Sequence, residues 1–155
     1  MEKVFQGRAI VPGVIEGEVL VTHQPLNLLA SYRKIALNKR ARKVICADKN
    51  NTELFKVDLT NKIICLPQTV GSTTGGIILQ MAAKMGIGPK ALLFSDHIDS
   101  LAAAGIVLTR VWIDKQIITI DQLGKGFLEF VKQGDIVKTD NQGIVKIFRP
   151  VHLVN

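Results

Sequence analysis

The sequence contains few aromatic residues, few cysteines and no long uninterrupted apolar run. Tryptophan and tyrosine occur once each among 155 residues, and aromatic residues make up only 5% of the chain. No apolar run reaches the ~18 residues that a transmembrane helix needs. The start, Met1 to Phe5, also lacks the charged and then apolar order of a signal peptide. We therefore expect a cytoplasmic protein with no membrane partner.

The scarcity of cysteine excludes the common metal sites. Cys46 and Cys65 are the only two cysteines, they lie far apart, and they match no metal-binding spacing. A structural zinc site or an iron–sulfur cluster needs about three or four such ligands. We interpret both thiols as small buried hydrophobic residues and expect this chain to bind no metal or other cofactor.

Acidic residues are also in deficit, since 13 Asp and Glu stand against 20 Lys and Arg, which gives a net charge of +7. Much of the excess lies in the segment Arg33–Lys43. No aromatic residues interleave with these cations, as a stacking surface for bases would require, so we expect no nucleic-acid partner. The segment is interpreted as a solvated basic loop, and a docking surface for a partner protein is the alternative.

What remains is a chain of one domain's length that is 47% hydrophobic and rich in Ile, Val and Leu. The pattern places strands near both ends of the chain and βαβ units between them, with no internal repeat. Strands are predicted at Phe5–Val11, Val14–Thr22, Lys62–Leu66, Ala91–Phe94, Gln116–Ile120, Asp135–Lys138 and Ile144–Phe148. Helices are predicted within Leu26–Lys39, over Ile78–Met85, over Ile98–Ala104 and over Lys125–Lys132. The prediction is a single α/β domain over residues 1–155, in which residues 29–59 are insertion-like.

The segment most suited to chemistry is Gly71-Ser72-Thr73-Thr74-Gly75-Gly76, which joins a predicted buried strand to a predicted helix. Unpaired amides and the dipole at a helix start favour anions, and glycines let a ligand approach the backbone. The loop lacks the lysine of a nucleotide P-loop and the glycine spacing of a dinucleotide site. Ordinary capping and turn formation by Ser, Thr and Gly is the structural alternative.

The other polar residues carry weaker signals. His97 lies between Asp96 and Asp99, but no second His or Cys completes a metal site nearby, so a polar turn that opens a helix is expected. We expect incidental surface, cap or turn positions for His23, His152, Glu16, Glu18, Asp114 and Asp121.

Several stretches, taken together in their order and separations, carry a family resemblance over most of the chain. They are Gly7–Gly13 with Glu16–Val21 and Gln24–Leu26, Lys62–Pro67 with Gly71–Gly76, Gly88–Leu93 with Asp99 and Gly105–Val107, and finally Gly134–Val137. These stretches resemble the aconitase-X swivel domain. That family includes the small subunits of archaeal phosphomevalonate dehydratase and of bacterial cis-3-hydroxyproline dehydratase.

The resemblance implies a swivelling β/β/α domain docked on an aconitase-X large subunit that carries an iron or iron–sulfur centre. It implies loss of water from a small, anionic hydroxy acid, such as cis-3-hydroxy-L-proline or mevalonate 5-phosphate, with the iron as Lewis acid for the leaving hydroxyl. Ser72 matches the loop serine that acts as base or orients the substrate. We expect the carboxylate or phosphate to be held by Gly71, Thr73, Thr74 and Gly75.

Two departures from the family pattern bear on function. Many members have an arginine before the Gly-Ser pair, where this chain has Val70. Such an arginine could form a two-pronged contact with a substrate carboxylate. Residues 29–59 also depart, which affects the prediction of partner docking. A subunit that assembles without catalysing is therefore an open alternative.

Two further readings of a swivel domain stay open at this stage. One is a non-catalytic binding or regulatory module that uses the basic segment Arg33–Lys43. The other is a phosphotransfer domain of the phosphoenolpyruvate-utilising type, which needs a histidine in its Ser-containing loop. Here that loop has no histidine, and His97 lies only after the next predicted strand.

Overall fold

An eight-stranded sheet with the order β1-β10-β9-β3-β5-β7-β8-β2 forms the frame of the computed structural model, which describes residues 1–150. A separate two-stranded sheet pairs β4 with β6. The strands are β1 (Glu2–Gln6), β2 (Arg8–Val11), β3 (Glu16–Val21), β4 (Leu26–Asn27), β5 (Ile63–Leu66), β6 (Thr69–Val70), β7 (Ala91–Phe94), β8 (Ile118–Asp121), β9 (Ile136–Thr139) and β10 (Ile144–Phe148). The helices are α1 (Leu28–Tyr32), α2 (Lys34–Leu37), α3 (Gly75–Lys84), α4 (Ser100–Ile113) and α5 (Lys125–Phe130).

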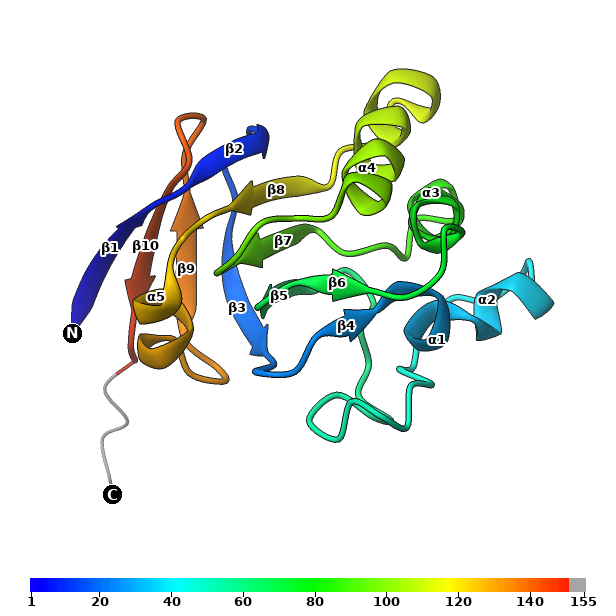
Figure 1. The fold of residues 1–155 in the computed structure, drawn as a ribbon, viewed down its shortest axis with the longest axis horizontal. Helices are drawn as coiled ribbons and strands as arrows, with labels where there is room; N and C mark the ends of the chain where they lie inside the picture. Colours follow the sequence, from blue (N-terminus) through cyan, green and yellow to red (C-terminus); the bar gives the residue numbers. More distant parts are fainter. Residues whose placement is uncertain (151–155) are drawn as a thin grey trace.

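The two edge strands of the large sheet, β1 and β2, are joined by Gly7 alone, so the sheet curves until its edges almost meet (Figure 1). A Cβ on Gly7 would lie 2.5 Å from the backbone oxygen of Asp121, so no other residue fits this crossing. The single strand predicted over Phe5–Val11 is therefore wrong. The predicted strand is divided into two strands at Gly7, because β1 pairs with β10 and β2 pairs with β8.

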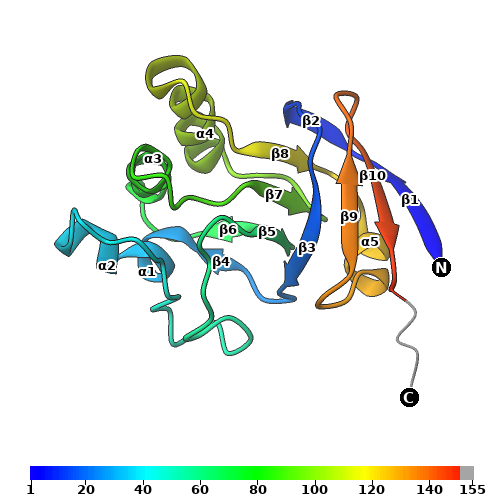
Figure 2. The ribbon, with the colours of Figure 1, turned by 180° about the vertical axis from the view of Figure 1, so that it is seen from behind.

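Alternating side chains of the central strands separate two hydrophobic cores. In β5, Ile64 and Leu66 belong to the core that also contains residues of α3 and α4, whereas Ile63 and Cys65 pack with residues of β9 and β10. Figure 2 shows the resulting layers: the parallel strands lie between the helices α1 to α4 and the antiparallel strands. The predicted β/β/α architecture, with strands at both ends of the chain, is confirmed, and all four residues of β5 are buried as expected.

Helices α3 and α4 approach each other at two glycines, Gly76 and Gly105. A Cβ on Gly105 would lie 2.3 Å from the Cα of Gly76, so the two backbones are in direct contact. The sequence predicted a helix over Ile98–Ala104, and its predicted end is wrong, because α4 continues through Gly105 to Ile113. Gly105 serves close helix packing and does not end the helix. The helix ends instead at Asp114, whose φ of 54° confirms its predicted role as a cap.

Segment 29–59 is partly helical, as predicted, and it contributes side chains to the core. Tyr32, Ile35 and Leu54 are at most 1% exposed. The cations of Arg33–Lys43 lie exposed on and after α2, in agreement with a solvated basic segment. Whether segment 29–59 is an insertion stays a prediction. Both cysteines are free and buried. Among residues 1–150, no helix has the length and apolar character needed to cross a membrane.

Candidate functional site

A small pocket of about 150 Å³ opens where α3 and α4 begin, on the helical side of the sheet. It is bordered by the loop predicted to carry chemistry and by the starts of α1 and α4. The lining residues are Leu28, Thr69, Val70, Gly71, Ser72, Gly75, Asp99, Leu101 and Ala102. The Gly76–Gly105 contact holds α3 and α4 together and thereby brings the loop before α3 next to the start of α4.

The path of the loop is fixed by its contact with Asn27. Strand β6 pairs in parallel with β4, and Asn27 lies opposite Val70. Gly71 then takes a φ of 110°, and a Cβ at this position would lie 2.6 Å from Asn27 Oδ1. Asn27 itself caps α1, since its Oδ1 accepts a hydrogen bond from the Ala30 amide at 3.0 Å. The glycine is therefore required both by the backbone angle and by the neighbouring side chain.

Asp99 ties the other side of the loop to α4. Its Oδ1 accepts hydrogen bonds from the amides of Leu101 and Ala102 at 3.0 and 2.9 Å, which caps the helix. Its Oδ2 accepts a hydrogen bond from the hydroxyl of Thr69 in β6. Sequence reasoning gave Asp99 no site role and considered it only as a neighbour of His97 and as part of the family resemblance. The capping role could have been found from an Asp before an apolar run, but the bond to Thr69 spans thirty residues and has no local signal.

Ser72 lies exposed at the mouth of the pocket, and the hydrogen-bond partner of its side chain is Thr74. Its Oγ accepts a hydrogen bond from the Thr74 amide at 3.2 Å and lies 2.8 Å from the Thr74 hydroxyl. The Gly75 amide donates to the backbone oxygen of Ser72 at 3.0 Å. Of the predicted site residues, Gly71, Ser72 and Gly75 line the pocket, and Thr73 and Thr74 are exposed beside it.

The charge in the pocket is unexpected for a site that receives an anion. Asp99 is the only ionisable residue in the lining, which contains no lysine or arginine. Val70, where the resembled family often has arginine, is 43% exposed. Any contact of this lining with an anion would therefore come from amides and hydroxyls.

The donor set of the pocket does not fit an iron or iron–sulfur centre, because it offers one carboxylate and neutral hydroxyls. Across residues 1–150, no group of three or more His, Cys, Asp and Glu side chains could hold a metal ion. Cys65 is fully buried in the sheet, where burial raises the pKa of its thiol. No catalytic step is therefore assigned to a metal held by this chain.

The other polar residues considered from the sequence lie outside the pocket. Asp96 and His97 are exposed in the turn before α4, as predicted. Asp121 was expected to be a cap or turn residue, and this is wrong. It is fully buried in β8 because it pairs with Arg8, whose Nη2 lies 2.8 Å from its Oδ2, and it accepts a hydrogen bond from the Ile98 amide. Glu16 and Glu18 face solvent on β3, as expected.

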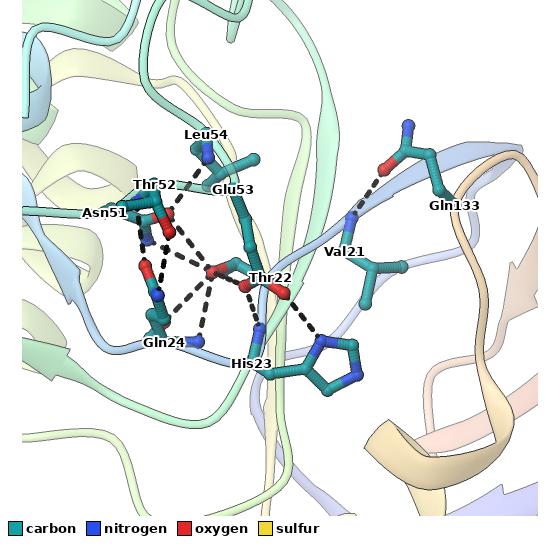
Figure 3. A network of polar contacts seen from close by, with 9 residues as sticks. All are labelled: Val21, Thr22, His23, Gln24, Asn51, Thr52, Glu53, Leu54 and Gln133. Carbon is teal, nitrogen blue, oxygen red and sulfur yellow. Dashed lines mark hydrogen bonds and ion pairs between the residues drawn. The ribbon is translucent and has the colours of Figure 1, made fainter. Parts of the chain in front are cut away.

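His23 was expected to be incidental, but it belongs to a network that anchors a long loop to the end of β3 (Figure 3). The carboxylate of Glu53 accepts hydrogen bonds from the Thr22 hydroxyl at 2.8 Å and from the His23 amide at 2.6 Å. The His23 Nδ1 lies 3.0 Å from Glu53 Oε1. Burial alone would raise the pKa of Glu53, but the hydrogen bonds from His23 and Thr22 lower it below its ordinary value. His152 lies outside the described residues.

Comparison with known proteins places this geometry in a known context. The family model of the aconitase X swivel domain matches residues 4–147. A phosphomevalonate dehydratase small subunit of Methanosarcina acetivorans is 25% identical over 147 residues, which cover 94% of this chain and 92% of the relative. The corresponding small subunit of Pyrococcus furiosus is 28% identical over 142 residues, or 85% of this chain and 98% of the relative.

A solved structure shows the same architecture. The crystal structure of Thermococcus kodakaraensis aconitase X in its holo-form matches with a TM-score of 0.77 at 25% sequence identity. The match covers 95% of this chain and 99% of the matched chain, so the likeness extends over nearly the whole of both.

Proposed function

Because this chain belongs to the aconitase X swivel domain family, we propose that it is the small subunit of a dehydratase and works only together with a large subunit. The main support for the proposal is the pocket at the starts of α3 and α4, which exposes Ser72 and whose lining has one carboxylate, too few ligands to hold a metal ion. When two subunits share an active site, each one contributes only some of the groups that the reaction needs. A pocket with a candidate base and no metal site agrees with such an arrangement. The proposed reaction is the loss of water from a small hydroxy acid, in the cytoplasm.

Exposed apolar side chains around the pocket support a partner protein on this side. Val70 and Leu101 line the pocket and are 43% and 44% exposed, and Ile77 on α3 is 57% exposed. Trp112, near the opposite end of α4 from the pocket, is 72% exposed. Exposed apolar side chains at the edge of a polar pocket, such as Val70 and Leu101, are typical of protein interfaces.

In the assembled enzyme, we propose that Ser72 removes a proton from the substrate. A serine is a poor base unless its deprotonated form is stabilised, and donors at a helix start can supply that stabilisation once a partner excludes water. Gly71, Thr73, Thr74 and Gly75 are proposed to contact the carboxylate or phosphate of the substrate. Gly71 and Gly75 line the pocket, which supports this role, whereas the amides of Thr74 and Gly75 are already engaged by Ser72.

The iron or iron–sulfur centre is proposed to lie in the large subunit. Mevalonate 5-phosphate is the first candidate substrate, because the curated relatives are phosphomevalonate dehydratase small subunits. Cis-3-hydroxy-L-proline is the second candidate. Because the pocket lining contains no lysine or arginine, the cation that pairs with a substrate anion is proposed to come from the partner subunit in either case.

The test is co-expression of this chain with an aconitase-X large subunit, followed by size-exclusion chromatography, an iron assay and turnover measurements with both substrates. We expect a stable complex that contains iron, and we expect Ser72→Ala to lose turnover by about 100-fold or more without loss of assembly. Asn141→Ala, in the exposed turn between β9 and β10, is the control and should retain turnover. A chain that elutes alone under these conditions would contradict the subunit proposal.

A non-catalytic binding module is the second candidate function. It is favoured by Val70 in the pocket and by the exposed cations of Arg33–Lys43 next to Leu37, which is 90% exposed. Under this alternative, the chain assembles with a partner in a salt-sensitive manner, but no substrate is turned over and Ser72→Ala changes nothing. The phosphotransfer alternative has no support, because the loop before α3 contains no histidine and His97 lies after β7.

A further inference from the structure

Three helices begin beside the pocket, and α3 differs from the other two because the side chain at its cap position makes no capping hydrogen bond, while Ser72 Oγ two residues earlier accepts an amide hydrogen bond. Asn27 caps α1 and Asp99 caps α4, and both have extended backbone angles, with ψ values of 105° and 154°. Thr74 occupies the cap position of α3, but its ψ is −3° and its side chain makes no capping hydrogen bond. A threonine at this position ordinarily accepts a hydrogen bond from an amide of the first helical turn.

The hydroxyl of Thr74 is directed to Ser72 instead. The two hydroxyl oxygens lie 2.8 Å apart, and the amide of Thr74 also donates to Ser72 Oγ at 3.2 Å. Either hydroxyl can donate while Ser72 is protonated. Once the exposed Ser72 has given up its proton to water, only Thr74 of the two can donate, and its hydroxyl and amide then supply two hydrogen bonds to the same oxygen. Hydrogen bonds to the charged form of a group favour that form.

We propose that Thr74 is a positioning residue that holds Ser72 Oγ at the pocket mouth and stabilises its deprotonated form. This inference rests on the proposed role of Ser72 as base, and it gives the Thr74 hydroxyl a role other than contact with the substrate. Both the amide and the hydroxyl of Thr74 contact Ser72 Oγ, so the position of that oxygen depends on Thr74.

The first test needs neither partner nor substrate. In the full chain carrying Ser72→Cys, the pH dependence of alkylation by iodoacetamide reports the pKa of the introduced thiol. The native Cys46 and Cys65 are buried and contribute little to the fast reaction. Adding Thr74→Val should raise the thiol pKa by about half a unit or more, and Thr74→Ser should restore it. Thr73→Val, which removes an exposed hydroxyl next in sequence, is the matched control and should leave it unchanged.

The second test uses the complex with the large subunit. Thr74→Val should lower kcat about 10-fold and change KM little. It should also raise the apparent pKa of the basic group in the pH–rate profile, whereas Thr74→Ser should retain most of the activity. A rise in KM with unchanged kcat would mean that Thr74 binds substrate, and it would overturn the inference. Equal thiol pKa values with Thr74→Val and Thr73→Val would overturn it as well. Turnover retained in Ser72→Ala would remove the proposed base, yet it would leave the thiol measurement intact, so the two failures are distinguishable.

Discussion

The contact between Gly76 and Gly105 determines how closely α3 and α4 pack, so Gly105→Ala is the most direct perturbation of the site's frame. The new Cβ would lie 2.3 Å from Gly76 Cα and 2.5 Å from Gly76 O. Ordinary carbon contacts lie at about 3.5–4.0 Å, so the helices must separate by roughly 1.2–1.7 Å. Both contacted atoms belong to the backbone and cannot rotate away. The separation would also widen the pocket between Gly75 and Leu101.

The magnitude follows from two opposing effects. Forcing an extra methyl group into a packed contact costs about 1–3 kcal/mol, and replacing glycine by alanine within a helix gains about 1 kcal/mol. Because the contact is backbone against backbone, we expect the upper part of the first range. The net result is a loss of about 1–2 kcal/mol in the free energy of unfolding.

Urea denaturation of the full chain measures this loss as a lower midpoint with an unchanged slope. Gly126→Ala in α5 is the matched control, because a Cβ at Gly126 meets nothing within 4 Å. That variant should be stabilised by up to about 1 kcal/mol. If Gly105→Ala proved as stable as Gly126→Ala, the close contact between the helices would not exist as described.

Three further predictions concern stability. The hydroxyl of Tyr32 is buried without a hydrogen-bond partner within residues 1–150, so Tyr32→Phe should be neutral or stabilise the fold by about 1 kcal/mol in urea denaturation. Burial works to raise the pKa of Asp135, but hydrogen bonds from Arg149 and a backbone amide lower it below its ordinary value. The Asp135–Arg149 pair therefore stabilises the fold above pH ~4, and this stabilisation is lost as the pH falls below that value. Arg149→Gln should therefore flatten the decline of the unfolding free energy between about pH 4 and pH 2, and an unchanged decline would contradict this. Gly71→Ala should lower the denaturation midpoint more than Gly86→Ala, because both glycines have positive φ but only Gly71 has a neighbour within 4 Å.

The sequence alone was sufficient where the determining pattern is local. The continuous apolar runs predicted β5 and β7, because strands buried on both faces have no polar side. The spacing of Ile78 and Ala82 predicted α3. The Gly-Ser loop before it, which the sequence indicated as suited to chemistry, borders a pocket, and its contact with a substrate stays a prediction. The family resemblance added the β/β/α layers, which the structure confirms, and the expectation of a partner subunit, which stays a proposal.

The tertiary structure alone decided features that depend on residues distant in sequence. Gly7 and Gly105 each resemble ordinary glycines, yet one lies at a crossing between two sheet edges and the other at a helix contact, so a strand and a helix were assigned wrong limits. The burial of Asp121 depends on Arg8, which lies 113 residues away. The same holds within the site. The sequence could name Ser72 and Thr74, but only the fold shows that the Thr74 hydroxyl makes no capping bond and contacts Ser72 instead, because hydrogen-bond direction is set by three-dimensional geometry rather than by residue type.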